Sequence, residues 1–166
     1  AGVIALCLLG AGGAAAAPLF EPVTVLSRAG TANQPALQAL MGSPSTSAVQ
    51  EVRVDAAAVS PVQKQLEFEL LGQPVQALQS KVETLADGGS IWYGQIGTRA
   101  GARLIKAGAP DPMNAVILVR SGNTVTGSIR KDGQLYRLRP VSDGRHVLVE
   151  VDEARMPADH PADYNS

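Results

Sequence analysis

The sequence predicts a mainly β protein, in which an antiparallel meander forms a sandwich or half-barrel with one short helix near the N-terminus. Two observations carry this prediction. Glycine and proline are frequent, with 17 and 11 residues, while aromatic residues make up only 4%, a composition typical of turn-rich β folds. In addition, apolar and polar residues alternate along several segments that are bounded by tight-turn signals.

The strongest strand signals lie between Ala115 and Asp152. The segments AVILVR, TVTGSIR, QLYRLRP and RHVLVEVD are separated by Gly122-Asn123, Asp132-Gly133 and Asp143-Gly144, pairs that tolerate positive φ angles in two-residue turns. We expect an antiparallel sheet of at least four strands, backed by the earlier strands. Within each predicted strand, alternate residues share one face of the sheet: Val125, Gly127 and Ile129; Tyr136 and Leu138; and Val147, Val149 and Val151. The opposite face is predicted to carry Arg137, Arg139 and Glu150.

Earlier segments supply further elements. Strands are predicted at Pro22–Ser27, Val49–Asp55, Gln65–Leu70 and Ser90–Gly97, and a helix at Asn33–Gly42 with Asn33 as N-cap. The segment Val75–Leu85 fits a strand or a helix, and we favour a strand because Asp87-Gly88-Gly89 turns the chain into the clear strand that follows. The stretch from Arg99 to Asn114 is rich in glycine and proline and is expected to be a loop or a broken edge strand.

The first twenty residues, AGVIALCLLGAGGAAAAPLF, carry no charge. A short apolar run followed by small residues is typical of a secretory signal peptide, with cleavage expected after Ala16 or Ala17. The basic start and the initiator methionine are missing, so residues 1–17 are interpreted as a signal peptide trimmed at its start. The alternative, a transmembrane anchor, is disfavoured because a spanning helix needs ~20 strongly apolar residues. The sequence therefore predicts a secreted or periplasmic protein without a stable membrane anchor.

No pattern in the chain predicts catalysis. Gly10–Ala15 matches a dinucleotide-binding fingerprint, but Pro18 follows at once and no acidic residue closes the motif. Cys7 is the single cysteine and lies in the signal region, which excludes a cysteine ligand or nucleophile elsewhere. The histidines His146 and His160 form no zinc motif. Basic and acidic residues number 14 and 15, so the charge gives no reason to expect nucleic-acid binding, and we expect no enzyme activity in this chain.

Residues from about Val49 to Pro161 resemble the N-terminal propeptide of secreted bacterial zinc metalloendopeptidases of the reprolysin-like and peptidyl-Asp metalloendopeptidase kind. The resemblance rests on the order of a Trp-x-Gly strand, the segments V-T-G-S-I-R, D-G, L-Y-R-L-R-P and D-G-R-H-V-L-V-E-V-D, and a final D-H-P. The residues that carry this family-like framework are Trp92, Gly94, Gly127, Asp132, Gly133, Tyr136, Arg139, Pro140, Gly144 and His146.

The resemblance implies a propeptide that acts as inhibitor and folding aid for a metalloprotease catalytic domain in cis, which is absent here. Zinc would belong to that domain, whose HExxHxxGxxH motif this sequence lacks. The resemblance divides the chain into 18–48 (strand, helix and loop), 49–152 (β prodomain) and 153–166 (acidic linker). Because no cysteine follows the signal region, inhibition must come from steric cover of the cleft or from an oxygen or imidazole donor. The candidates for contact with the protease zinc or cleft are Asp152, Glu153, Asp159 and His160.

A second interpretation remains open from the residues alone. The chain is then a stand-alone secreted or periplasmic β-sandwich binding module that ends naturally at Ser166 and has no protease partner. The two interpretations differ in whether the reading frame continues into an HExxH motif.

Overall fold

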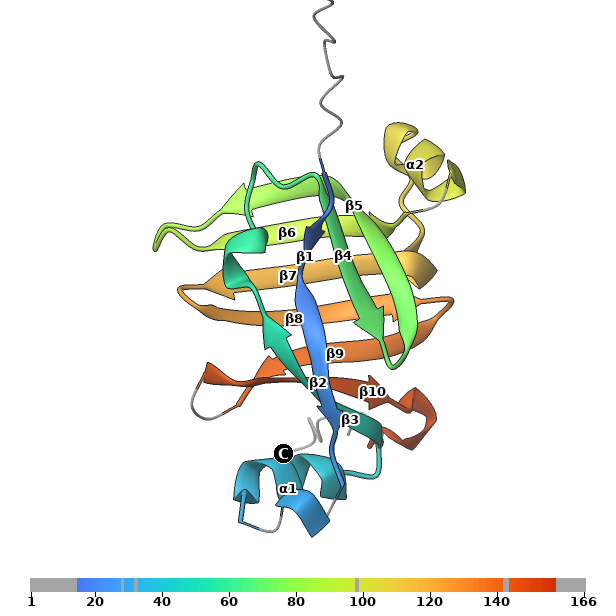
Figure 1. Cartoon of the computed structure of the whole chain (residues 1–166). Helices are drawn as coiled ribbons and strands as arrows, with labels where there is room; N and C mark the ends of the chain where they lie inside the picture. Colours follow the sequence, from blue (N-terminus) through green and yellow to red (C-terminus); the bar gives the residue numbers. More distant parts are fainter. Residues whose placement is uncertain (1–14, 28, 32, 98, 142–143, 158–166) are drawn as a thin grey trace, which may run out of the picture.

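The computed structural model describes residues 15–27, 29–31, 33–97, 99–141 and 144–157, and it is built around one ten-stranded sheet that curls into a nearly closed barrel (Figure 1). The strands are β1 (Ala17–Pro18), β2 (Phe20–Val25), β3 (Thr46–Val54), β4 (Gln65–Leu70), β5 (Gln73–Thr84), β6 (Ser90–Ile96), β7 (Ala115–Ser121), β8 (Thr124–Lys131), β9 (Gln134–Pro140) and β10 (His146–Val151). The helices are α1 (Pro35–Gly42) and α2 (Arg99–Lys106), and short 3₁₀ turns include Ala56–Ala58, Pro112–Asn114 and Glu153–Arg155.

The strand order is β1-β4-β5-β6-β7-β8-β9-β10-β3-β2, and every pair except β1 with β4 is antiparallel. The meander predicted from the sequence is therefore confirmed, and so is the strand assignment of Val75–Leu85, most of which lies in β5. The turn at Asp132-Gly133 has φ angles of 50° and 82°, as the prediction of a tight two-residue turn requires. A single curved sheet forms, so the half-barrel alternative is the correct one.

The N-terminal strand closes the barrel. Within nine residues, β1 pairs with β4 at one edge of the sheet and β2 pairs with β3 at the other. Leu19, which lies between them, donates its N–H to the Glu67 carbonyl at 2.8 Å and accepts the Asp55 N–H at 2.8 Å. Its side chain is fully buried. A short segment of chain thus satisfies both sheet edges, which would otherwise expose unpaired backbone groups.

Two apolar clusters stabilise the barrel. The larger one fills the interior and includes Trp92, Leu118, Ile129, Leu138 and Leu148, all with 0% exposure. The smaller one lies between α1 and the outer face of β3, β9 and β10. Its buried members are Leu37, Val49, Leu135, Val147, Val149 and Val151.

This second cluster corrects the predicted faces of the meander. Val147 and Val149 are the register partners of Arg139 and Arg137, so these valines and arginines share the outer face. The sequence pattern placed them on opposite sides. β10 is buried on both faces because the barrel interior covers one and α1 covers the other, so its residues do not follow the alternation of a half-buried strand.

The prediction of a loop or edge strand from Arg99 to Asn114 is wrong for its first half, where α2 forms. Gly108, with φ of 71°, ends this helix: its N–H donates to Ile105 and the Ala109 N–H donates to Leu104. These paired bonds are the helix-terminating arrangement for which glycine is favoured. The glycines were interpreted as loop formers, whereas Gly108 marks a helix end.

Helix α1 lies where it was predicted, with one difference at its start. Gln34, and not Asn33, occupies the N-cap position, and it makes no side-chain capping bond. Pro35 begins the helix, where its missing N–H costs nothing. None of the helices in the described ranges is long and apolar enough to cross a membrane.

Candidate functional site: the C-terminal segment and its support

The chain that follows β10 is held against the barrel by specific bonds. The Asp152 N–H donates to the Ser45 carbonyl at 2.8 Å, and the Asp152 carboxylate accepts the Ala154 N–H at 3.1 Å. Arg155 contacts the same carboxylate at 3.2 Å. Asp152 therefore caps the 3₁₀ turn Glu153–Arg155 and fixes the direction in which the chain leaves β10.

A bidentate ion pair secures this turn from the side. Arg130 on β8 donates to both carboxylate oxygens of Glu153, with N–O distances of 2.8 and 2.6 Å, and it also donates to the Gly133 carbonyl. The hydrogen bond with Glu153 raises the pKa of Arg130, and the same bond lowers the pKa of Glu153. Both groups therefore stay charged over the ordinary pH range. Arg130 was not recognised from the sequence, because no local pattern links two residues 23 positions apart.

The structure describes two of the four residues that were predicted to contact the protease. Asp152 and Glu153 already have internal partners, so either one could reach a metal only after giving up its present bonds. Asp159 and His160 lie outside the described residues. The predicted cleavage residues Ala16 and Ala17 lie at the start of the described chain, and Ala17 already belongs to β1.

The framework residues of the resemblance turn out to shape the barrel. The Trp92 ring fills the interior and its Nε1–H donates to the Gln63 carbonyl at 2.9 Å. A side chain on Gly94 would begin only 2.3 Å from that ring, so glycine is required where the indole packs. Gly127 likewise leaves room for Leu118 on the neighbouring strand.

The remaining framework residues lie at strand ends and on both faces. Asp132 and Gly133 form the β8–β9 turn, while Pro140 ends β9 and Gly144, with φ of 72°, precedes β10. Tyr136 is buried, and desolvation together with Glu150 raises its pKa. Arg139 lies on the outer face.

His146 is the buried polar residue of this framework, at 2% exposure. Its Nε2 accepts the Val125 N–H at 3.1 Å. A hydrogen bond with the Gly144 backbone raises the pKa of the imidazole and partly offsets the lowering by burial. Because Nε2 is an acceptor here, the imidazole is neutral. Burial lowers the pKa of His146 below its ordinary value of 6.5.

We expect this histidine to make the barrel sensitive to acid. The unfolded chain binds the proton more readily than the folded one, so the contribution of His146 to stability is complete above pH 6.5 and is lost as the pH falls through and below 6.5. Thermal unfolding midpoints at pH 7.5 and 5.5 test this. The wild-type midpoint should fall more than that of His146→Gln, which keeps an acceptor for the Val125 N–H. Equal falls in both proteins would contradict the assignment.

Among the residues that the structure describes, no group of three or more histidine, cysteine, aspartate or glutamate side chains could hold a metal ion. The two glutamates Glu67 and Glu69 lie on β4, and Glu67 accepts a hydrogen bond from Gln76 on the adjacent strand. The described site therefore consists of a barrel and of a chain segment after β10 that is held against it.

Comparison with known proteins identifies relatives of this chain. The chain is 68% identical over 168 residues to a peptidyl-Asp metalloendopeptidase of Stenotrophomonas maltophilia strain R551-3, an alignment that covers 99% of this chain and 39% of that protein. This chain is the counterpart of the N-terminal part of peptidyl-Asp metalloendopeptidases. The resemblance to the N-terminal part of peptidyl-Asp metalloendopeptidases, stated from the sequence, is thereby confirmed.

Two further relatives carry the same name. One from Stenotrophomonas maltophilia strain K279a is 66% identical, and one from Xanthomonas campestris is 53% identical. Each alignment covers 99% of this chain, so the chain spans about two fifths of the length of the relatives that it matches. No family model and no solved structure matches the chain.

Proposed function

We propose that this chain is the propeptide of a secreted zinc metalloendopeptidase, in which it acts as inhibitor and folding aid for the catalytic domain. The observation that carries the proposal is the match of the entire chain to the N-terminal two fifths of proteins named metalloendopeptidases. The sequence itself contains no HExxH motif. The chemistry of such an enzyme then belongs to the part of the relatives that lies beyond the matched region.

The division of the chain follows from this role. Residues 1–17 would be the signal peptide, with cleavage after Ala16 or Ala17, and residues 18–152 the folded body with its N-terminal strand and helix. Cleavage after Ala17 removes the first residue of β1, but cleavage at either position leaves β2 and the Leu19 bonds to Glu67 and Asp55 in place. Residues 153–166 would lead to the catalytic domain, beginning with the turn that Arg130 holds.

Inhibition is proposed to come from the segment that follows this turn. Asp152 and Glu153 are engaged with Arg155 and Arg130, so the proposal assigns the role of zinc donor to the other two candidates, Asp159 and His160. A carboxylate or a neutral imidazole can take the zinc position that a catalytic water would hold. The barrel would then position the segment, and the segment would close the active site.

An inhibition assay tests the proposed function directly. The chain from Ala15 to Ser166, which retains every described element, is added to the Stenotrophomonas maltophilia R551-3 protease from which the N-terminal part has been removed. Cleavage of a peptide substrate that contains aspartate is then measured. We expect inhibition that saturates with increasing chain and persists when zinc is added. A folded chain that leaves the protease fully active would refute the inhibitor role.

The same assay tests the donor residues. We expect the double variant Asp159→Ala/His160→Ala to inhibit about tenfold less strongly or worse, a loss of about 1.4 kcal/mol, because the zinc regains its open position. Asn165→Ala, in the same segment but without a metal-ligating side chain, serves as the matched control and should inhibit like the wild type. Unchanged inhibition by the double variant would exclude this mechanism and leave steric cover by the barrel.

A further inference from the structure

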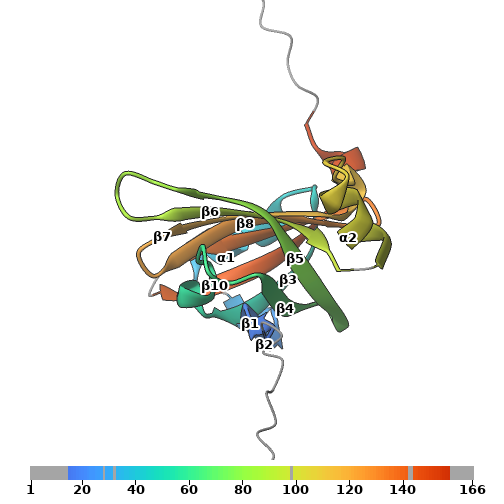
Figure 2. The same ribbon diagram turned by 90° about the horizontal axis from the view of Figure 1, so that it is seen from above.

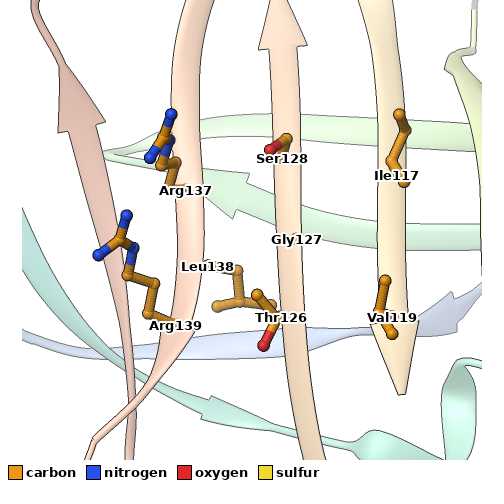
Figure 3. Close-up of a pocket in the computed structure, with 8 residues that line it drawn as sticks. All are labelled: Ile117, Val119, Thr126, Gly127, Ser128, Arg137, Leu138 and Arg139. Carbon is orange, nitrogen blue, oxygen red and sulfur yellow. The ribbon is translucent and has the colours of Figure 1, made fainter. Parts of the chain in front are cut away.

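A shallow groove crosses the outer face of β7, β8 and β9, and we call it the outer groove (Figure 3). Its volume is about 220 Å³. Side chains from the three strands point to the same face, in register across the sheet. They are Ile117 and Val119 on β7, Thr126 and Ser128 on β8, and Arg137 and Arg139 on β9.

The two arginines of the outer groove differ from other arginines of the barrel. Arg53, Arg130, Arg145 and Arg155 each lie within 4 Å of a carboxylate. Arg137 and Arg139 make no hydrogen bond or ion pair with the residues that the structure describes, although Arg137 influences Glu153 from a longer distance. Two guanidinium groups on neighbouring positions of one strand face therefore remain available to a partner.

The floor beside these arginines is apolar. Ile117 is 42% exposed, which is unusual for a large aliphatic side chain in the centre of a sheet, and Val119 lies next to it. Ile117 also borders a second hollow of about 210 Å³ that reaches Tyr93 and Pro110. Where α1 covers the outer face of the barrel, the equivalent apolar residues are buried. The outer groove is the part of this face that α1 leaves uncovered.

The exit of the chain lies at the end of this groove. Arg137 and Arg139 also border a hollow of about 100 Å³ that contains Leu40 of α1 and Met156. In Figure 2 the last described residues, in red, lie on the same side of the barrel as the outer face of β6 to β8. β1 and β2 lie on the opposite side. In the relatives, the region matched by this chain accounts for about two fifths of the length and the larger part of the protein follows it.

We propose that the outer groove is the docking surface for the catalytic domain that follows in the precursor. This inference rests on the proposed function. The domain would present a segment with at least one carboxylate to Arg137 and Arg139, with an apolar side chain against Ile117 and Val119. A guanidinium binds a carboxylate through two parallel hydrogen bonds, which gives both charge and geometric selection.

Two physical arguments favour this occupant. A domain joined through the segment that follows Met156 is tethered near the groove, so its effective concentration there is high and a modest interface suffices. The strands β7, β8 and β9 are each paired on both sides, so a partner at the outer groove cannot add a strand there and must bind the side chains of the face. The apolar centre with a charged rim is the composition of a protein–protein contact.

Charge reversal tests the proposal. We would measure the affinity of the Ala15–Ser166 chain for the same Stenotrophomonas maltophilia protease by titration calorimetry, at low and high salt. The variant Arg137→Glu/Arg139→Glu should bind at least about tenfold more weakly, and the loss should shrink at high salt because screening weakens charge pairs. Ile117→Asp, which removes the apolar contact from the same face, should weaken binding as well. The matched control is Arg53→Glu, an exposed arginine on β3 that does not line the groove, and it should bind like the wild type.

Unfolding midpoints measured on every variant show that each is folded. Wild-type affinity in both groove variants overturns the docking surface, while inhibition by the wild-type chain would still support the proposed function. A wild-type chain that neither binds nor inhibits refutes the proposed function and this inference with it. A wild-type dimer in sedimentation that the arginine variant converts to a monomer identifies a second copy as the occupant and also overturns the proposal.

Discussion

Replacing Trp92 by alanine should lower the free energy of unfolding by about 3–5 kcal/mol, the range found for large aromatic residues removed from cores. The side chain is completely buried at the centre of the barrel, and no neighbour can collapse fully into the space that it leaves. The change also removes the hydrogen bond from Nε1 to the Gln63 carbonyl. Equilibrium unfolding in urea, followed by circular dichroism, measures this loss.

Two companion variants separate packing from hydrogen bonding. Trp92→Phe retains most of the apolar volume but leaves the Gln63 carbonyl without its donor, so its cost should fall between those of wild type and Trp92→Ala. Tyr93→Ala removes the adjacent ring, which lies half-buried on the outer face, and should cost about 1 kcal/mol. Equal losses for Trp92→Ala and Tyr93→Ala would contradict the interior position of Trp92.

Leu19→Ala should lower the free energy of unfolding by about 2–5 kcal/mol, because Leu19 is buried where the two edges of the barrel meet. The cost includes loosened backbone pairing to Glu67 and Asp55, which the leucine side chain holds in register. Hydrogen exchange should then increase at β3 and β4, the two strands that the N-terminal segment joins. Urea unfolding and exchange measured on the same sample test both expectations.

The control for this variant is Val23→Ala on β2. Val23 is 51% exposed, so its loss should change stability by no more than about 0.5 kcal/mol. If Leu19→Ala were equally mild, or if exchange rose uniformly over the sheet, the N-terminal strand would not act as the closure of the barrel.

If both barrel residues behave as expected, the structural and functional parts of the proposal can be tested independently. Trp92 and Leu19 maintain the fold, whereas Arg137 and Arg139 have no described partner whose loss would destabilise it. A variant of the outer groove that stays folded but no longer inhibits would therefore report on docking. A core variant that no longer inhibits would report only on folding.

Much of the fold could be predicted from short-range patterns. Leu66, Phe68 and Leu70 alternate with glutamates because one face of β4 is buried and the other meets solvent. The turn at Asp132-Gly133 could be predicted because its two positive φ angles restrict the residue types that fit there. Where the local backbone conformation or the burial of one face restricts which residue types fit, the sequence pattern identifies the strand or turn.

The wrong predictions arise where contacts with another part of the fold change which residue types fit at a position. Val147 and Val149 follow a strand pattern, but α1 covers their face, so valine there does not mark the barrel interior. The segment around Gly108 contains loop-forming residues, yet its glycine ends a helix. His146 alternates with valines on its strand, and only the folded barrel shows that its imidazole accepts the Val125 N–H.

The sequence by itself determined the strands, most of their turns and the resemblance of the chain to the N-terminal part of peptidyl-Asp metalloendopeptidases, because each depends on the order of residues along the chain. The tertiary structure alone decided how the sheet closes, through Leu19 between Glu67 and Asp55. It also decided that Glu153 is held by Arg130, and that Arg137 and Arg139 face outward and make no hydrogen bond or ion pair with the described residues. These features depend on distances between residues remote in sequence, which the curvature and register of the sheet set.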